Sequence, residues 1–216
     1  MTEAYNMDCM EYMRTLPDKA FDLAVVDPPY GIHMDGGKLG GGVLARQSCY
    51  EKKKWDDRAP DEEYFAELRR VSKNQIIFGA NHFISKIPFD SHCWIVWDKE
   101  NGENKFADAE LAWTSFETAV RIFRFRWQGM LQGDQKNREK KIHPTQKPVA
   151  LYRWIYKNYA KNGDKILDTH LGSGSSRIAA FDMGLDFVGC ELDADYYKAQ
   201  EERFAAHAAQ MSLFVE

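Results

Sequence analysis

A short apolar run over residues 21–26, Phe-Asp-Leu-Ala-Val-Val, ends at Asp27-Pro28-Pro29-Tyr30. The run has the length and composition of a buried strand. Two consecutive prolines have no backbone N–H to give to a sheet, so the strand must stop there. The sequence therefore predicts a strand whose carboxyl end presents a carboxylate, a stiff backbone and an aromatic ring.

Strands and helices alternate along the 216 residues. Apolar runs predict further strands over residues 75–79, 94–97, 165–168 and 187–191, and a hairpin over 109–115 and 119–126. Helices are expected from about residue 60, from Pro148, over about 175–183 and from Asp193. This alternation is typical of an α/β fold, with a mostly parallel sheet and helices on both faces. The length suits one domain over residues 1–216.

Several function classes are disfavoured by composition. No run of about 18 apolar residues is present, so no membrane span is expected. The first residues lack the basic and apolar pattern of a secretory signal, so we expect a cytoplasmic protein. The four cysteines are far apart and form no paired spacing, so neither a metal site nor a disulfide framework is expected.

A glycine-rich turn follows the strand predicted at 165–168, in the segment Asp168-Thr169-His170-Leu171-Gly172-Ser173-Gly174. Glycines between a strand and a helix let a ligand approach the backbone, and Glu191 follows Asp168 by 23 positions, near the spacing of nucleotide-binding folds. The pattern is not G-x-G-x-x-G, so phosphate binding is not implied. Taken alone, the segment fits either a nucleotide-like ligand or an ordinary turn.

The segment Asp27-Pro28-Pro29-Tyr30 suits an exocyclic amine on a planar base. A carboxylate and a rigid backbone carbonyl can accept its two N–H protons, and the aromatic ring can stack on the base. Ligand sites of open α/β sheets lie at the carboxyl ends of strands, where this segment is expected. An ordinary turn at the end of a strand is the alternative.

Together, these two segments resemble the amino-methyltransferases of DNA in their β-class order, in which Asp-Pro-Pro-Tyr precedes the cofactor motif. Other segments also resemble that family, particularly its small phage and prophage members: Met7-Asp8-Cys9, Phe78-Gly79-Ala80-Asn81-His82-Phe83, Trp94-Ile95-Val96-Trp97-Asp98-Lys99 and His143-Pro144-Thr145-Gln146-Lys147-Pro148. The resemblance extends from about Tyr5 to Arg203. It departs at Thr169 and His170, where the family often has Pro-Phe, so that the contacts of that Phe are not carried over.

The resemblance implies a Rossmann-like methyltransferase fold with permuted motif order. It implies transfer of a methyl group from S-adenosylmethionine to the N6 amine of an adenine flipped out of double-stranded DNA, without a metal. The catalytic residues would be Asp27, Pro28, Pro29 and Tyr30. Asp8 would hold the cofactor adenine and Glu191 its ribose. The full set of implied cofactor residues is Asp8, Cys9, Thr145, Gln146, Lys147, Asp168, Thr169, His170, Gly172, Ser173, Gly174 and Glu191.

The chain carries a net charge of −4, but the charge is unevenly distributed. Residues 121–141 carry seven bases against two acids, with Phe123, Phe125 and Trp127 between them. Because no large recognition region is present, we expect segments 31–55 and 121–142 to face DNA. Their candidate contacts are Arg46, Lys52, Lys53, Lys54, Arg121, Arg124, Arg126, Lys136, Arg138, Lys140 and Lys141. The alternative is an insert at 31–55 and a solvated charge run; a homodimer is one way to extend the contact area.

Other functions remain open from the sequence. The same chemistry could act on N4 of cytosine, on RNA or on a protein glutamine; Asp at the first motif position favours adenine in the family. An inactive DNA-binding module would be expected to have lost Asp27 or the glycines. A small-molecule oxidoreductase lacks support, because the phosphate-binding glycine pattern is absent.

Overall fold

The computed structural model describes residues 1–39, 48–102, 106–128 and 131–212. Its elements in chain order are β1 (Thr2–Tyr5), α1 (Cys9–Arg14), β2 (Phe21–Val26), β3 (Gly37–Leu39), β4 (Ser48–Tyr50), α2 (Glu62–Val71), β5 (Ser72–Phe78), two 3₁₀ turns η1 (Ala80–His82) and η2 (Ile84–Lys86), β6 (Trp94–Asp98), β7 (Ala109–Thr114), β8 (Arg121–Arg124), β9 (Trp127–Gln128), β10 (Leu131–Gln132), α3 (Val149–Tyr159), β11 (Lys165–Asp168), α4 (Ser175–Asp182), β12 (Asp186–Cys190) and α5 (Ala194–Ser212).

Eight strands form one sheet in the order β1-β12-β11-β2-β5-β7-β6-β8. Neighbouring strands are parallel except at β5–β7 and β7–β6, where they are antiparallel. The hairpin predicted for 109–115 and 119–126 is wrong: β6 lies between β7 and β8, and β8 pairs with β6 in parallel. Sequence proximity favours a hairpin, but the partner of each strand is decided by tertiary packing.

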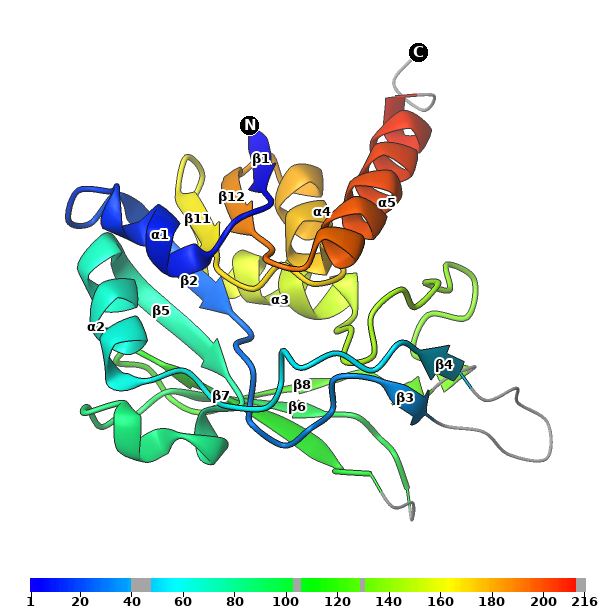
Figure 1. The fold of residues 1–216 in the computed structure, drawn as a ribbon, viewed down its shortest axis with the longest axis horizontal. Helices are drawn as coiled ribbons and strands as arrows, with labels where there is room; N and C mark the ends of the chain where they lie inside the picture. The colour runs from blue at the N-terminus through cyan, green and yellow to red at the C-terminus, as the bar shows by residue number, and fades with distance from the viewer. Residues whose placement is uncertain (40–47, 103–105, 129–130, 213–216) are drawn as a thin grey trace.

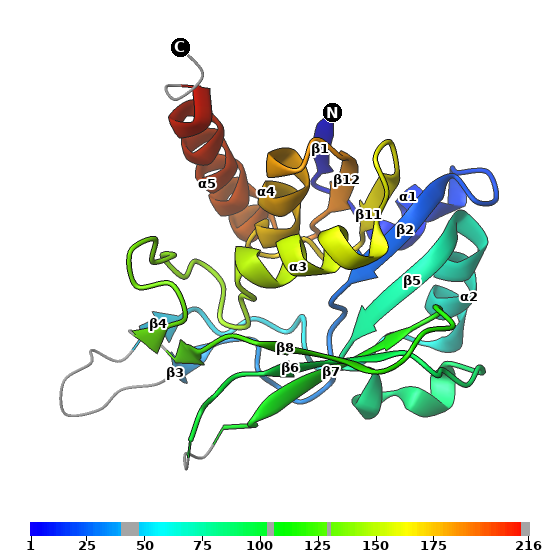
Figure 2. The ribbon, with the colours of Figure 1, turned by 180° about the vertical axis from the view of Figure 1, so that it is seen from behind.

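Helices cover both faces of this sheet. Alternation along β2 sends Leu23 and Val25 to one face and Ala24 and Val26 to the other. The first pair packs in a cluster with α3 and α4, and the second pair packs in a cluster with α1 and α2. Figures 1 and 2 show the helices in these two layers, with α5 beside α4. Each fully buried aliphatic side chain stabilises the fold by about 1.5–3 kcal/mol.

Two segments for which the sequence predicted no paired short strands contain them. β3 and β4 pair antiparallel within residues 31–55, and β9 and β10 pair within residues 127–147. Neither pair joins the main sheet. Of the helices in the described ranges, none combines the length and the hydropathy that crossing a bilayer requires.

Candidate active site

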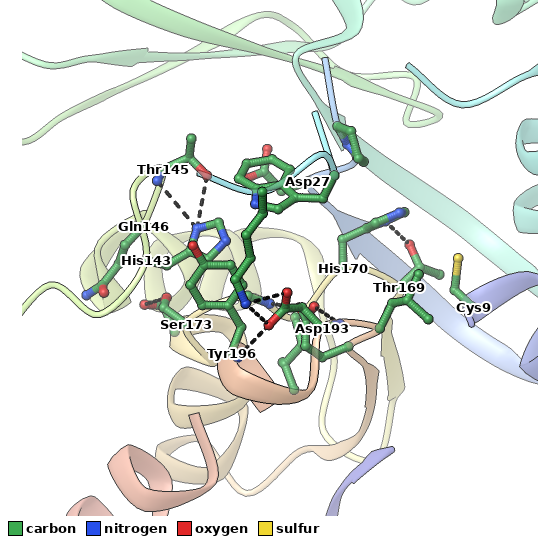
Figure 3. Close-up of a pocket in the computed structure, with 18 of the residues that line it drawn as sticks. Cys9, Asp27, His143, Thr145, Gln146, Thr169, His170, Ser173, Asp193 and Tyr196 are labelled. Atoms are coloured by element: carbon green, nitrogen blue, oxygen red, sulfur yellow. Dashed lines mark hydrogen bonds and ion pairs between the residues drawn. The ribbon is translucent and has the colours of Figure 1, made fainter. Parts of the chain in front are cut away.

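A cavity of about 580 Å³ lies at the carboxyl ends of β1, β12, β11 and β2. The strand order diverges here, because β2 is followed by β5 on one side and β11 by β12 on the other. Open α/β sheets bind ligands at such a switch point. The volume is in the range of small-molecule and cofactor sites. Figure 3 shows side chains from several loops converging on this cavity.

The turn after β11 forms one wall of the cavity through Thr169, His170, Leu171, Gly172 and Ser173. The Asp168 carboxylate lies beneath this wall and stabilises the turn: it accepts hydrogen bonds from His170 N (3.0 Å) and from the Ser176 hydroxyl. Gly174, with a φ of 72°, is the N-cap of α4. The predicted cofactor residues Asp168 and Gly174 therefore shape the turn, and neither is among the residues that line the cavity.

Two carboxylates border the cavity from different elements. Glu191, after β12, accepts hydrogen bonds from Gly172 N and Asp193 N, both at 2.8 Å. Burial raises the pKa of Glu191, and these two N–H groups oppose that effect. Asp8 is the N-cap of α1 and accepts hydrogen bonds from Met10 N and Glu11 N through Oδ1. Both carboxylates are thus held in place by backbone donors at the edge of the cavity.

An aromatic group forms another wall. The ring of His143 lies between Tyr196 on α5, at 4.2 Å, and Trp55, at 5.1 Å between ring centroids. Burial lowers the pKa of His143 to about 3, so the imidazole is neutral at physiological pH. Its Nδ1 accepts a hydrogen bond from the Thr145 hydroxyl at 3.1 Å (Figure 3). Gln146 also lines the cavity. Trp55 and Tyr196 were not predicted from the sequence, because no motif contains them.

Lys53, one of the predicted DNA contacts, lies at the cavity. Its ammonium pairs with Asp193 at 2.6 Å and with Asp195 at 2.7 Å, and the side chain lines the cavity. These contacts connect residues 53–55 to the start of α5. The Lys53 ammonium is thus paired with two carboxylates at the cavity, and its contact with DNA stays a prediction.

The segment after β2 holds the predicted catalytic residues. Asp27 and Pro29 line the cavity, and the Tyr30 hydroxyl donates a 2.6 Å hydrogen bond to Asp27 Oδ1. Buried Asp56 accepts hydrogen bonds from Tyr30 N (2.7 Å), Gly31 N (2.8 Å) and Met34 N (2.8 Å). Three backbone N–H groups donate to this one carboxylate, so the conformation of the loop is fixed. Asp56 was missed in the sequence because it lies 26 residues from Tyr30.

Lys147 lines the cavity, but oxygens of the protein surround its ammonium. It forms an ion pair with Asp27, another with Glu110 at 3.1 Å, and a 3.2 Å hydrogen bond to the Tyr30 hydroxyl. Burial alone would lower the pKa of Lys147, but Asp27 and Glu110 raise it. The ammonium therefore stays charged. These contacts direct it toward Asp27, whereas the sequence predicted a contact with the cofactor.

The predicted DNA contacts divide into exposed and covered groups. Among the described residues, the exposed members are Lys52, Lys54, Arg121, Arg124, Arg126, Lys136, Arg138 and Lys140. Lys141 is half-buried over the ring of Trp127, and burial lowers its pKa to about 8. Arg46 lies outside the described residues. Phe123 stacks on Phe125 and contacts Trp154 of α3, so these rings pack against the protein.

Comparisons with known proteins agree with this arrangement. The family model described as DNA methylase matches residues 92–202. The type II methyltransferase M.HinfI of Haemophilus influenzae is 25% identical over 91% of this chain, and M2.MboI of Moraxella bovis is 23% identical over 93%. The chain spans 66% of the length of the first relative and 86% of the second.

Two solved structures share the fold. A complex described as M1.HpyAVI-SAM is 21% identical, with a TM-score of 0.62 over 94% of this chain and 98% of that one. The PvuII DNA methyltransferase, described as cytosine-N4-specific, is 12% identical, with a TM-score of 0.59 over 95% of this chain and 92% of that one. The chain therefore belongs to the DNA methylase family of S-adenosylmethionine-dependent DNA methyltransferases, and the predicted family, fold class, enzyme class and cofactor are confirmed.

Proposed function

We propose that this protein transfers the methyl group of S-adenosylmethionine to the N6 amine of an adenine flipped out of double-stranded DNA. The observation that carries the proposal is the position of Asp27. Its carboxylate lies on the wall of the cavity, beside the rigid Pro28-Pro29 backbone and the Tyr30 ring. A single opening thus combines a cofactor-sized space with hydrogen-bond acceptors for an amine.

The residues that line the cavity fit the cofactor. Asp8 and Glu191 supply carboxylates at its edge, suited to the adenine amine and the ribose hydroxyls. The backbone at Gly172 approaches the cavity without a side chain, and neutral His143 places no positive charge beside a sulfonium. The other proposed cofactor contacts that line the cavity are Cys9, Thr145, Gln146, Thr169, His170 and Ser173.

Bound S-adenosylmethionine supplies an already activated methyl group on a sulfonium. The protein's part is to place the amine nitrogen in line and to exclude water. The amine lone pair is delocalised into the base, so hydrogen bonds to the Asp27 carboxylate and a backbone carbonyl of Pro28-Pro29 favour a tetrahedral nitrogen. Positive charge then develops on that nitrogen, and these contacts strengthen, so they stabilise the transition state more than the ground state. Tyr30 stacks on the base.

Segments 31–55 and 121–142 are the proposed DNA side of the molecule. This proposal is supported by the contact of Trp55, at the end of the first segment, with His143, the residue that follows the second segment, because both residues line the cavity. The eight exposed bases named above would supply phosphate contacts. A homodimer and a cytoplasmic location stay predictions.

Labelled S-adenosylmethionine, incubated with the purified protein and with DNA or RNA, tests the substrate class. Single-molecule methylation sequencing of DNA from expressing cells then reports the base and its context. We expect N6-methyladenine in DNA. Label on N4 of cytosine or on RNA would replace the proposed substrate, and DNA binding without transfer of label would favour an inactive binding module.

Variants test the proposed mechanism. Asp27→Ala should lower the rate of transfer by about 10² or more, the usual loss for an oriented transition-state group, with little change in cofactor affinity. Asp90→Ala, on an exposed loop, is the matched control and should keep the wild-type rate. Wild-type turnover in Asp27→Ala would contradict the mechanism.

A further inference from the structure

A line of alternating charges leads from the cavity to the sheet behind it. It consists of Asp27, Lys147, Glu110 on β7 and Lys99, the residue after β6. Lys147 pairs with Asp27 on one side and lies 3.1 Å from Glu110 Oε2 on the other. Glu110 Oε1 in turn lies 2.5 Å from the ammonium of Lys99. Glu110 lies in none of the segments that carry the family resemblance, and Lys99 is the last residue of one of them.

This line is shielded from water. The Lys147 side chain is 3% exposed, and those of Glu110 and Lys99 are 23% and 17% exposed. Ion pairs in such surroundings are screened far less than pairs on the surface. Lys147 carries three N–H groups, and three oxygens lie near them, from Asp27, Glu110 and Tyr30. The position of the ammonium is therefore set by the balance between two carboxylates.

This balance matters because Asp27 has to accept a hydrogen bond from the base. If Asp27 were the only anion near Lys147, the ammonium would hold it as a tight pair, and the base amine would compete poorly. A second carboxylate on the far side of Lys147 weakens that hold, while the positive charge still stabilises the ionised form of Asp27.

We propose that Glu110 is a positioning residue for methyl transfer: it offsets the pull of the Lys147 ammonium on Asp27, so that Asp27, which Lys147 keeps ionised, can accept a hydrogen bond from the target amine. The inference rests on the proposed function, because it concerns how Asp27 acts on the base. Lys99 keeps Glu110 ionised from the opposite side.

The directions of the pKa shifts agree. Burial raises the pKa of Asp27, Lys147 lowers it and Glu110 raises it, so the two neighbours oppose each other. Burial alone would raise the pKa of Glu110, but Lys147 and Lys99 lower it to about 2. Glu110 is therefore an anion at every pH at which the protein is expected to work.

Other titratable groups also face Asp27 from the elements around it. They are Tyr30 of the same loop, Tyr64 of α2, Tyr152 of α3 and Asp168 at the end of β11. Burial raises the pKa of Tyr30, Tyr64 and Tyr152 well above 10, so these rings stay neutral in the acid range. Burial raises the pKa of Asp168 to about 7, and Asp27 and Glu191 contribute to that rise. Glu110 is not among the main causes of this shift, so the titration of Asp168 should depend mainly on its burial and not on the charge of Glu110.

Single-turnover methyl transfer at saturating S-adenosylmethionine, measured from about pH 5 to about pH 9, tests the proposal. Glu110→Gln keeps the shape of the side chain and removes its charge. We expect the plateau rate to fall about tenfold, less than for loss of Asp27 itself. We also expect the acid limb of the pH–rate profile to move to lower pH. Without the charge of Glu110, nothing opposes the lowering of the Asp27 pKa by Lys147. Cofactor affinity, measured by calorimetry, should change less than about twofold, because Glu110 does not line the cavity.

A second variant covers the outcome that Glu110→Gln does not fold. Lys99→Met removes the cation that restrains Glu110, so Glu110 attracts Lys147 more strongly and the acid limb should move to higher pH. The matched control is Glu117→Gln, an exposed residue just after β7, which should keep the wild-type rate and profile. Opposite shifts in the two variants are not expected from a loss of packing.

Two results would overturn the inference: a wild-type rate in Glu110→Gln, or a slower rate whose acid limb does not move. For Lys99→Met, an unmoved acid limb would do the same. Neither result affects the proposed function, because wild-type protein would still methylate DNA. Failure of wild-type protein to transfer label to DNA would instead overturn the proposed function.

Discussion

The ring of Tyr30 lies against Gly79 so closely that a methyl group added to Gly79 would overlap Cε1 and Cζ of the ring. Gly79 follows β5 with a φ of 68°, a conformation that costs other residues about 1 kcal/mol or more. The glycine thus provides the space that lets Tyr30 reach Asp27, while His82 stacks on the Tyr30 ring at 5.1 Å.

Gly79→Ala should therefore slow methyl transfer by at least about tenfold, since a displacement of about 1 Å at a reacting group can cost more than that. Cofactor affinity should change little, because Gly79 does not line the cavity. The measurement is single-turnover transfer together with calorimetry. Gly163→Ala is the matched control: its φ of 86° is also positive, but nothing lies within 4 Å of an added methyl group. An equal loss of activity in both variants would show that strain, and not the Tyr30 contact, is responsible.

Glu191→Gln should weaken the binding of S-adenosylmethionine by about tenfold, because hydrogen bonds to a charged group contribute about 1.5 kcal/mol or more. At saturating cofactor the transfer rate should stay within about threefold of wild type, since ribose contacts are the same in the ground state and the transition state. Calorimetry measures the affinity, with exposed Glu202→Gln on α5 as the control. Unchanged affinity would remove Glu191 from the cofactor site.

Asp168 makes the stability of the cofactor-free protein depend on pH. Burial raises its pKa to about 7, whereas an unfolded aspartate titrates near pH 4. Between about pH 4 and about pH 7, the folded protein binds one more proton than the unfolded chain. The free energy of unfolding therefore falls as pH rises over this range, by at most about 4 kcal/mol. Below pH 4 both states are protonated, and the contribution is fully present.

Asp168→Asn cannot titrate and should remove this part of the pH dependence. Relative to wild type, the variant should gain stability as pH rises toward 8, as measured by urea unfolding across that range. Asp90→Asn, on an exposed loop, should follow the wild-type curve. Parallel curves for Asp168→Asn and wild type would show that Asp168 is already ionised in the folded protein.

Local chemistry explains which parts of the site were predictable. The prolines after β2 and the glycines after β11 restrict the backbone within a few residues, so the positions of Asp27 and of the 168–174 turn followed from the sequence. The contacts of Lys53 with Asp193 and of Lys147 with Tyr30 join residues more than 100 positions apart. Glu110, Asp56 and Tyr196 carry no motif, and only packing brings them to the site. The strand partner of β8 was predicted wrongly for the same reason, because tertiary packing and not sequence proximity decides it.

The last prediction concerns how the protein holds DNA. Arg124, Arg126 and Lys140 are exposed within segment 121–142, and Arg124 makes only a loose 3.4 Å pair with Asp98. The segment continues into His143 at the cavity wall, so a duplex that presents a base to Asp27 has to pass near it. Phosphate contacts dominate such binding and make it strongly dependent on salt.

Replacing Arg124, Arg126 and Lys140 together with alanine should weaken DNA binding and reduce the slope of log affinity against log salt by about 1 to 3, because each phosphate that the protein neutralises contributes about 0.9 to that slope. Fluorescence anisotropy at several salt concentrations measures both, and calorimetry should find cofactor affinity unchanged. Lys157, Lys161 and Lys165 form the matched control, because they are exposed at the opposite ends of the strands. Their triple alanine variant should keep the wild-type slope, since a duplex that reaches the cavity does not extend to that end. A slope that falls in the control and not in the first variant would place the DNA on the other side of the molecule.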